Sequence, residues 1–283
     1  MSGLASPRKT IDILKKYNLR LSKSLGQNFL VDENILKKII HAANLKSEDV
    51  VLEVGSGIGT LTQVLAERAG QVIAVELDRT LIPILSETLK GFENVKLLRR
   101  DALKLDLNLL PPSLQPNKLV SNLPYNIASP LLVKYLHEYP QIELFVVTIQ
   151  KELAERILAS PGGKDYGAFT LKIQYYSEPK MISIVPRTVF LPPPKVDSAV
   201  IKLKRLSSPR VGVKHPSHLF ELITAAFEHR RKTIKNSLIH SSRLSYGKRE
   251  VEKALKGANI DPERRGETLS IYEFALLSES LQA

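Results

Sequence analysis

The sequence contains no cysteine and no tryptophan, and it has no long uninterrupted apolar run. The absence of cysteine excludes disulfides, thiolate metal sites and a cysteine nucleophile. No apolar run approaches the roughly 20 residues that a helix needs to span a bilayer. The N-terminus also lacks the apolar stretch of about 7–15 residues that marks a secretory signal. We therefore expect a cytoplasmic protein with no membrane partner.

Basic residues outnumber acidic ones. The 283 residues include 41 Lys and Arg against 29 Asp and Glu, which gives a formal net charge of +12. This excess favours an acidic partner, nucleic acid before an anionic membrane, although simple solubility would also explain it. The six histidines show no metal-ligand spacing, so the sequence predicts no metal site.

The sequence predicts three parts. Residues 1–28 form a basic arm, which could bind phosphates, be a solvated tail or be an organelle transit peptide. Residues 29–205 carry an α/β pattern. A composition shift at 207–209 opens a small, all-helical part, residues 206–283, whose last helix begins with a capping box of Ser270 and Glu273.

Short β-branched runs alternate with amphipathic stretches in the middle of the chain. Strands are expected at Val50–Val54, Val72–Val75, Val95–Leu98, Lys118–Val120 and Leu144–Ile149. Helices are expected at Asn34–Ala43, Thr60–Ala69, Thr80–Leu89, Pro130–Leu136 and Glu152–Ser160. This alternation is typical of βαβ units and a mostly parallel sheet. Two further runs, 181–185 and 198–204, predict an antiparallel hairpin at one end of the sheet. Asp32 is expected to cap the first of these helices, and Gly70 to end the second.

A glycine turn follows the first predicted strand. Val51–Thr60 has the spacing G-x-G-x-G, whereas the dinucleotide fingerprint is G-x-G-x-x-G. Glu76, at the end of the next strand, can accept hydrogen bonds from ribose hydroxyls, but this does not separate a dinucleotide from another adenosine cofactor. Glu53, Asp101 and Asn122 also lie at or just past the ends of predicted strands, and strand ends line the ligand crevice of an open α/β sheet. The alternative is that Glu76 or Asp101 only caps the next helix.

The tetrapeptide Asn122–Tyr125, Asn-Leu-Pro-Tyr, is the most specific signal. Proline removes an amide donor, so the turn presents carbonyl oxygens, and asparagine adds another acceptor. Tyrosine adds a flat face on which a base can stack. Together these groups suit a planar ring that carries an exocyclic amino group. The alternative is an ordinary turn with the tyrosine packed in the core.

Several strings resemble one known family. An Asn-[Leu/Ile/Pro]-Pro-[Tyr/Phe] turn behind a G-x-G-x-G loop resembles the S-adenosylmethionine-dependent methyltransferases that act on adenine N6. Four further strings are similar to the ribosomal RNA adenine dimethyltransferases, and more closely to their small-subunit branch, the kasugamycin-sensitivity dimethyltransferase family. These strings are Ser24–Leu30, Gln150–Glu152, Phe190–Ser198 and Arg230–Leu238. The similarity runs from about residue 10 to about residue 275.

The resemblance implies a Rossmann-like class I methyltransferase sheet with a small C-terminal helical domain, and S-adenosylmethionine as cofactor, leaving S-adenosylhomocysteine. The implied cofactor-binding residues are Asn28, Leu30, Gly55, Gly57, Glu76, Asp101, Ala102 and Asn122. The implied catalytic residues are Asn122, Leu123 and Tyr125. The implied substrate-binding residues are Tyr125 and Phe190, which would sandwich the base, and Arg230, Arg231, Lys232 and Lys235, which would bind RNA phosphates. Core packing is the alternative for Phe190, and a solvated helix face is the alternative for the basic cluster.

The activity that the resemblance implies is dimethylation at N6 of two adjacent adenosines near the 3' end of 16S ribosomal RNA. The partner would be the pre-30S particle during small-subunit biogenesis, and the enzyme would be a monomer. Three alternatives remain at this stage: a non-catalytic RNA-binding assembly factor, a large-subunit methyltransferase that confers macrolide resistance, and an NAD-dependent dehydrogenase. The dehydrogenase is disfavoured because the third glycine comes one residue early.

Overall fold

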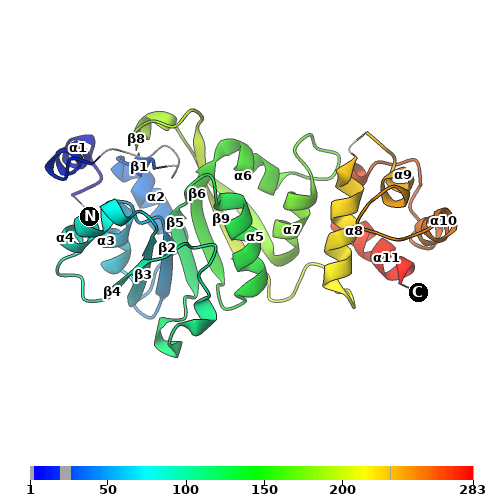
Figure 1. Ribbon diagram of the computed structural model, residues 1–283, viewed down its shortest axis with the longest axis horizontal. Coiled ribbons are helices and arrows are strands. Elements are labelled where there is room, and N and C mark those ends of the chain that lie inside the picture. The colour runs from blue at the N-terminus through cyan, green and yellow to red at the C-terminus, as the bar shows by residue number, and fades with distance from the viewer. Residues whose placement is uncertain (1–2, 20–26, 230, 283) are drawn as a thin grey trace. The chain divides into compact units, whose positions relative to one another are not determined.

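The computed structural model describes residues 3–19, 27–229 and 231–282, which form two compact units (Figure 1). The first unit comprises Met1–Ala154 and Glu178–Arg205, and the second comprises Glu155–Ser177 and Leu206–Ala283. The sequence pattern places residues 155–177 in the α/β part. In the structure they belong to the helical unit, because Leu171 and Tyr175 are buried in its apolar core.

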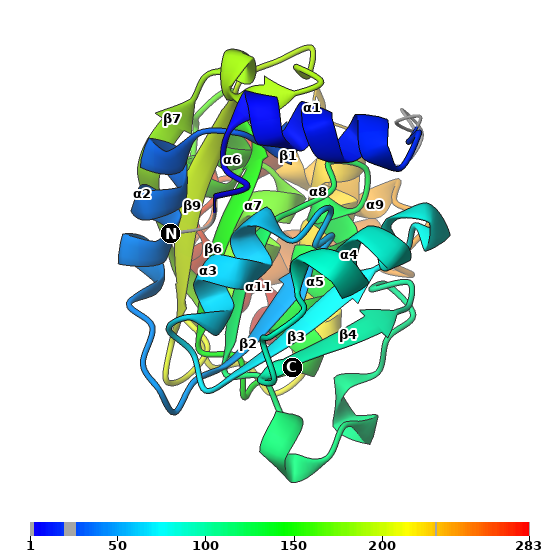
Figure 2. The ribbon, with the colours of Figure 1, turned by 90° about the vertical axis from the view of Figure 1, so that its left-hand side faces the viewer.

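The first unit is built on a seven-stranded sheet with the strand order β4-β3-β2-β5-β6-β9-β7. The strands are β2 (Val50–Val54), β3 (Gln71–Glu76), β4 (Val95–Arg99), β5 (Lys118–Asn122), β6 (Leu144–Gln150), β7 (Ser177–Val185) and β9 (Ser198–Arg205). Strands β2 to β6 pair in parallel, and β9 runs antiparallel to β6. The predicted Rossmann-like, mostly parallel sheet with an antiparallel hairpin is therefore confirmed. Figure 2 shows β2, β3 and β4 side by side.

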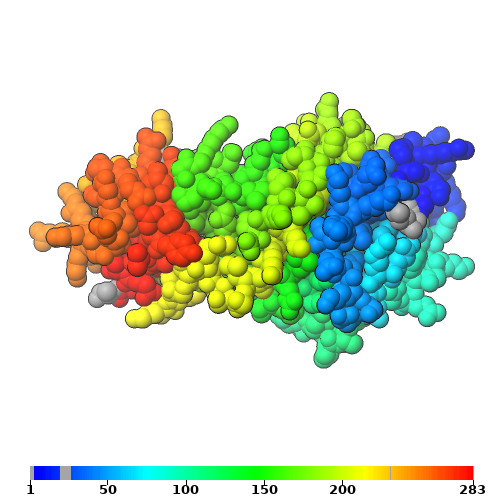
Figure 3. All heavy atoms as spheres, turned by 180° about the vertical axis from the view of Figure 1, so that it is seen from behind, coloured from blue at the N-terminus to red at the C-terminus, as the bar shows by residue number. Residues whose placement is uncertain are grey.

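Helices accompany this sheet, and those that follow β2, β3 and β5 connect its parallel strands. The accompanying helices are α1 (Pro7–Lys16), α2 (Glu33–Ala43), α3 (Thr60–Ala66), α4 (Ile82–Thr88), α5 (Ala128–Glu138) and α6 (Lys151–Leu158). Helices α2 and α3 bury Ile39 and Leu65 in one cluster with Val51 and Val120 of the strands. Seen from behind, the blue segment of α2 lies beside the yellow-green segment of β7 (Figure 3), and Lys38 Nζ donates to Ser183 Oγ at 3.0 Å.

Two predicted helix ends can be compared with the structure. Asp32 caps α2 as expected, since its Oδ1 accepts from the backbone N–H groups of Asn34 and Ile35 at 2.8 and 2.9 Å. The predicted role of Gly70 is wrong, because α3 already ends at Ala66. A β-carbon on Gly70 would lie 2.2 Å from the carbonyl oxygen of Ser47, so this glycine permits a close backbone approach instead.

One element of the first unit is absent from the sequence-based prediction. A two-stranded antiparallel sheet pairs β1 (Phe29–Leu30) with β8 (Phe190–Leu191). Part of the N-terminal arm is the helix α1, whose Lys16 Nζ lies 2.5 Å from Glu87 Oε1. Ile13 and Leu14 of this helix pack against a buried cluster that includes Leu85. The described part of the arm is therefore attached to the sheet unit.

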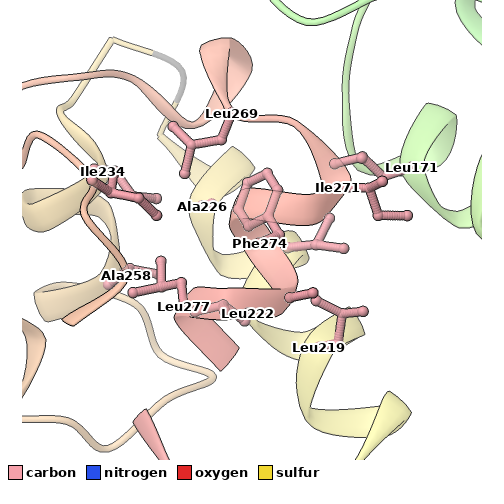
Figure 4. Packing of buried hydrophobic residues seen from close by; sticks show 14 of the residues in the cluster. Leu171, Leu219, Leu222, Ala226, Ile234, Ala258, Leu269, Ile271, Phe274 and Leu277 are labelled. Atoms are coloured by element: carbon pink, nitrogen blue, oxygen red, sulfur yellow. The ribbon is translucent and has the colours of Figure 1, made fainter. Parts of the chain in front are cut away.

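The second unit is helical. Its helices are α7 (Ala168–Tyr176), α8 (Pro216–Glu228), α9 (Ile234–Ile239), α10 (Lys248–Gly257) and α11 (Ile271–Leu281). Phe274 of α11 packs with Leu219, Leu222 and Ala226 of α8 in one buried cluster (Figure 4). The capping box of Ser270 is confirmed, because Glu273 N donates to Ser270 Oγ at 3.3 Å and Ser270 N donates to Glu273 Oε2 at 2.8 Å.

Short 3₁₀ turns complete the chain. They are Arg79–Leu81, Leu107–Leu109, Pro112–Leu114, Arg187–Val189 and Gly266–Thr268. Within the described ranges, no helix combines the length and the apolar character needed to cross a membrane.

Candidate active site

A cavity opens in the first unit beyond the carboxyl ends of β2, β3 and β5. It lies where the strand order reverses between β2 and β5, which is the usual ligand crevice of an open parallel sheet. Its walls come from the loops that follow these strands and β4, and from the segment around β1. The lining residues include Gln27–Leu30, Glu53–Ile58, Glu76, Leu77, Arg100–Ala102 and Asn122–Ile127.

The glycine loop between β2 and α3 needs its glycines for two reasons. Gly55 and Gly57 have φ angles of +78° and +61°, which side chains disfavour. A β-carbon on Gly55 would lie 2.9 Å from Pro124 Cγ, and one on Gly57 would lie 3.0 Å from the ring of Phe29. The loop therefore packs directly on the Asn-Leu-Pro-Tyr turn on one side and on β1 on the other.

Glu76 ends β3 and is 7% exposed. Its Oε1 accepts from Leu77 N and Asp78 N, and its Oε2 accepts from Gly57 N, all at 2.9 Å. Burial raises the pKa of Glu76, and these three backbone hydrogen bonds oppose the rise. A carboxylate has about four acceptor positions, so one remains, on Oε2. That remaining position suits a ligand hydroxyl.

Glu53, one residue before the end of β2, also lines the cavity, as the strand pattern predicts. It is 2% exposed, and Thr62 Oγ1 donates to its Oε2 at 2.5 Å. Burial raises the pKa of Glu53 to about 8, and the hydrogen bond from Thr62 opposes the rise. The cavity lining therefore contains a buried carboxyl group whose surroundings favour its protonated form.

Asp101 and Ala102 form the wall that follows β4. Asp101 Oδ1 accepts from Leu103 N at 2.9 Å, and this bond shapes the turn. The Ala102 carbonyl accepts from the buried Tyr135 hydroxyl of α5 at 2.9 Å. Helix α5 therefore holds the backbone of this wall in place.

Asn122 is the central polar residue of the cavity wall. Its Nδ2 donates to the backbone carbonyl of Asn28 at 2.9 Å, which fixes the orientation of the side-chain amide. Its Oδ1 is buried, and no donor among the described residues reaches it. A buried acceptor without a donor is costly in a folded protein, and functional sites are where such groups occur. The backbone of the turn is held by Leu123 N, which donates to the Thr148 carbonyl at 3.1 Å.

Tyr125 contributes to the same cavity wall. Its hydroxyl lies 2.5 Å from Ser198 Oγ, at the first residue of β9. Burial raises the pKa of Tyr125, and the hydrogen bond with Ser198 opposes the rise. The tyrosine is therefore half-buried and held at its hydroxyl end, where it borders the cavity.

Most of the predicted site residues come together in this cavity. Its lining contains Asn28, Leu30, Gly55, Gly57, Glu76, Asp101, Ala102, Asn122, Leu123 and Tyr125. Phe190 is an exception and requires a correction. It is 2% exposed, packs in the core cluster with Leu30 and Val185, and does not line the cavity, so it cannot stack on a base in this conformation.

The predicted RNA-binding cluster belongs to the second unit. Arg231 and Lys232 are exposed, and the half-buried Lys235 has its Nζ 3.5 Å from Glu263 Oε1. Arg230 lies outside the described residues, as do the first three residues of the Ser24–Leu30 string.

Three further lining residues have no ligand role in the sequence-based prediction. Gln27 donates through Nε2 to Asp78 Oδ2 at 2.5 Å, and Leu77 and Arg100 lie in the loops that follow β3 and β4. For Leu77 and Arg100, the sequence signal is their position next to the predicted ligand residues Glu76 and Asp101.

The protein belongs to the class of Rossmann-like methyltransferases. The order of the strands, the glycine loop and the position of the crevice are all typical of this class. Within that class the chain belongs to the ribosomal RNA adenine dimethylase family, whose model matches residues 18–277. Members of this family are S-adenosylmethionine-dependent enzymes that dimethylate adenine in ribosomal RNA, and this chain is one of them.

Named relatives and solved structures agree with this family. The chain is 47% identical to the ribosomal RNA small subunit methyltransferase A of Alkaliphilus oremlandii over 99% of both chains. It is 48% identical to the protein of the same name from Clostridium botulinum, over 96% of this chain and 98% of that one. A dimethyladenosine transferase from Plasmodium falciparum has a TM-score of 0.74 at 29% identity, covering 87% of this chain and 94% of that one. The 23S rRNA methyltransferase ErmE has a TM-score of 0.68 at 30% identity, covering 90% and 100%.

The cavity fits the cofactor of this family. Three buried side-chain oxygens of its lining residues, Ser56 Oγ, Thr60 Oγ1 and Asn122 Oδ1, have no partner among the described residues. Glu76 keeps one acceptor position on Oε2. A ligand with several polar groups, such as a nucleoside that carries an amino acid, would satisfy such a set of atoms.

Proposed function

We propose that this enzyme transfers methyl groups from S-adenosylmethionine to N6 of two adjacent adenosines near the 3' end of small-subunit (16S) ribosomal RNA. The products would be N6-dimethyladenosines, formed on the pre-30S particle during small-subunit biogenesis. The observation that carries this proposal is the unpaired Oδ1 of Asn122 in the cavity wall beside the glycine loop.

The choice of small-subunit RNA rests on the relatives. Proteins named for the small subunit are 47% and 48% identical over nearly the whole chain, whereas the 23S enzyme is 30% identical. This difference supports the small subunit over the large subunit as the substrate.

Cofactor binding is proposed for four parts of the cavity. Glu76 would accept from a ribose hydroxyl at the free position of Oε2, and Asp101 would accept from the amino group of the cofactor's adenine. The glycine loop from Gly55 would pass beneath the methionine part. Asn28 and Leu30 would cover the ligand from the side of β1.

The target adenine is proposed to be held by its amino group. Asn122 Oδ1 and the Leu123 carbonyl would accept the two amino hydrogens, which favours a localised lone pair on N6. S-adenosylmethionine supplies an electrophilic methyl on a sulfonium sulfur. Because the product nitrogen becomes acidic once it is methylated, it can lose its proton to water, and we assign no side chain as base. Alignment of the reacting atoms is worth about 7–11 kcal/mol in well-oriented reactions.

The substrate adenosine must leave its stack to enter the cavity. Tyr125 would stack on the base, a contact worth about 1–3 kcal/mol. Arg231, Lys232 and Lys235, together with Arg230 and the basic arm 1–28, would bind RNA phosphates, so that binding weakens as salt is raised. In this arrangement the sheet unit carries the chemistry and the helical unit contributes to RNA binding, with one chain as the working unit.

The proposal is tested by incubating the protein with labelled S-adenosylmethionine and small ribosomal subunits that lack these methyl groups. Mass spectrometry of the RNA should find two adjacent N6-dimethyladenosines near its 3' end. Tight binding of the particle without methyl transfer at saturating cofactor would instead indicate a non-catalytic assembly factor. Methylation of large-subunit RNA alone would identify the other branch of the family.

A further inference from the structure

The string Phe190–Ser198 resembles the family's sequence, but its phenylalanine lies in the core and no cavity-lining residue comes from it. Its two ends nevertheless touch two different walls of the cavity. At one end, Phe190 and Leu191 pair with Leu30 and Phe29 of β1. At the other end, Ser198 Oγ lies 2.5 Å from the Tyr125 hydroxyl.

The Ser198 end is firmly held. Ser198 is 0% exposed and pairs with Gln150 at the end of β6. The preceding residue, Asp197, accepts from Lys151 N through its backbone carbonyl at 3.0 Å and from Arg187 N through Oδ1 at 2.9 Å. The serine hydroxyl therefore sits on a rigid support, which is what a group needs if it is to position another.

Tyr125 depends on that support. Its backbone belongs to a turn that β6 also holds, through the hydrogen bond from Leu123 N to the Thr148 carbonyl. The hydroxyl lies at the far end of the ring axis, so fixing the hydroxyl as well as the backbone fixes the direction of that axis and the position of the ring in the cavity wall. Ring stacking itself requires no hydroxyl. The hydroxyl of Tyr125 therefore has a role distinct from that of its ring.

We infer that Ser198 is a positioning residue for the methyl transfer, which sets the position of the Tyr125 ring and so the place at which N6 of the stacked base meets the methyl group. This inference rests on the proposed function of Tyr125 as the stacking face. It gives the string Phe190–Ser198 a function: one end supports β1 on the cofactor side, and the other orients the tyrosine on the base side.

The test is a double-mutant cycle of Ser198→Ala, Tyr125→Phe and the double variant, assayed for methyl transfer to unmethylated small subunits. Each single variant should lower kcat about 10- to 100-fold, since small misalignments of reacting groups have effects of this size. The double variant should be no worse than either single one, because all three lack the same hydrogen bond. The KM for S-adenosylmethionine should change less than about twofold, since Ser198 lies outside the cofactor part of the cavity.

Two further variants separate positioning from loss of a buried hydroxyl. Ser198→Thr keeps the hydroxyl and should restore most of the kcat. Ser177→Ala removes another fully buried serine hydroxyl at the first residue of a strand, one that donates to the Ile173 carbonyl at 2.8 Å, and should leave kcat unchanged. If Ser198→Ala lowers only the melting temperature, or if the effects of the two single variants on kcat multiply, the inference is overturned.

A readout without turnover keeps this inference separate from the proposed function. With [13Cζ]-tyrosine labelling, the Tyr125 signal is assigned by its loss in Tyr125→Phe. It should shift in Ser198→Ala and stay in place in Ser177→Ala. An unchanged signal in Ser198→Ala would refute the contact whether or not the wild-type enzyme methylates RNA, whereas an inactive wild type with a shifted signal would refute only the proposed function.

Discussion

The hydroxyl of Tyr135 donates a hydrogen bond of 2.9 Å to the backbone carbonyl of Ala102. Tyr135 is fully buried on α5, and Ala102 lines the cavity where the cofactor's adenine is proposed to bind. Its neighbour Lys134 donates to the Leu103 carbonyl at 2.7 Å. Helix α5 thus supports the loop that carries Asp101. The shape of this part of the cavity wall therefore depends on Tyr135, which does not line the cavity.

Tyr135→Phe should therefore weaken cofactor binding. The variant keeps the ring and leaves the buried Ala102 carbonyl without its donor, at a cost of about 1–3 kcal/mol in the free energy of unfolding. We expect the Kd for S-adenosylhomocysteine to rise about tenfold, the equivalent of about 1.4 kcal/mol, in calorimetric titration. The matched control is Tyr166→Phe, whose buried hydroxyl donates to the Leu269 carbonyl at 2.9 Å in the other unit. Equal changes in Kd for the two variants would contradict this account.

The glycine at position 55 is predicted to be irreplaceable because it combines a positive φ with a close contact. Gly55→Ala would place a β-carbon 2.9 Å from Pro124 Cγ, so the loop and the Asn-Leu-Pro-Tyr turn would have to separate. Gly162 has a similar φ of +81°, but a β-carbon added there would meet nothing within 4 Å. Gly162→Ala should then cost about 1–2 kcal/mol of stability from backbone strain alone.

Both alanine variants are compared by denaturant unfolding and by cofactor binding. Gly55→Ala should be the less stable of the two and should lose measurable affinity for S-adenosylhomocysteine, while Gly162→Ala should bind as the wild type does. Normal affinity in Gly55→Ala would mean that the two loops do not need to touch.

The sheet and its crevice could be predicted from sequence, because each has a local signal. The apolar runs from Val50 to Ile149 mark the parallel strands directly, and Glu76, Asp101 and Asn122 follow them in register. The two-residue pairing of Phe29 with Leu191 has no such signal, since it depends on residues more than about 160 positions apart meeting in space. For the same reason, the burial of Phe190 and the assignment of residues 155–177 to the helical unit could not be read from local patterns.

Ionisation of Glu53 should make stability depend on pH. Its pKa is raised from 4.5 to about 8 by burial, so between these values the folded protein binds a proton that the unfolded chain does not. The free energy of unfolding should therefore fall as pH rises through this range, by about 1.4 kcal/mol per pH unit from this group. The contribution of protonated Glu53 to the free energy of unfolding is complete below pH 4.5 and is lost above about pH 8.

Glu53→Gln tests this dependence, because the amide keeps the shape of the protonated carboxyl and cannot ionise. Its free energy of unfolding, measured by denaturant at several values between about pH 5 and 8, should fall less steeply than that of the wild type. Glu76, whose pKa is also raised, leaves some slope in both proteins. Parallel curves for the two proteins would show that Glu53 is already ionised in the fold.

The role of Asn122 is the centre of this account, and one variant tests it directly. Asn122→Ala removes the unpaired Oδ1 and the hydrogen bond to the Asn28 carbonyl, but leaves Glu76 and Asp101 in place. The measurement is N6-dimethyladenosine formed on unmethylated small subunits, together with the Kd for S-adenosylhomocysteine in the same preparation. We predict that methyl transfer is abolished while cofactor binding is weakened but still measurable. Wild-type turnover by Asn122→Ala would contradict the claim that this oxygen receives the amino group of the target adenine.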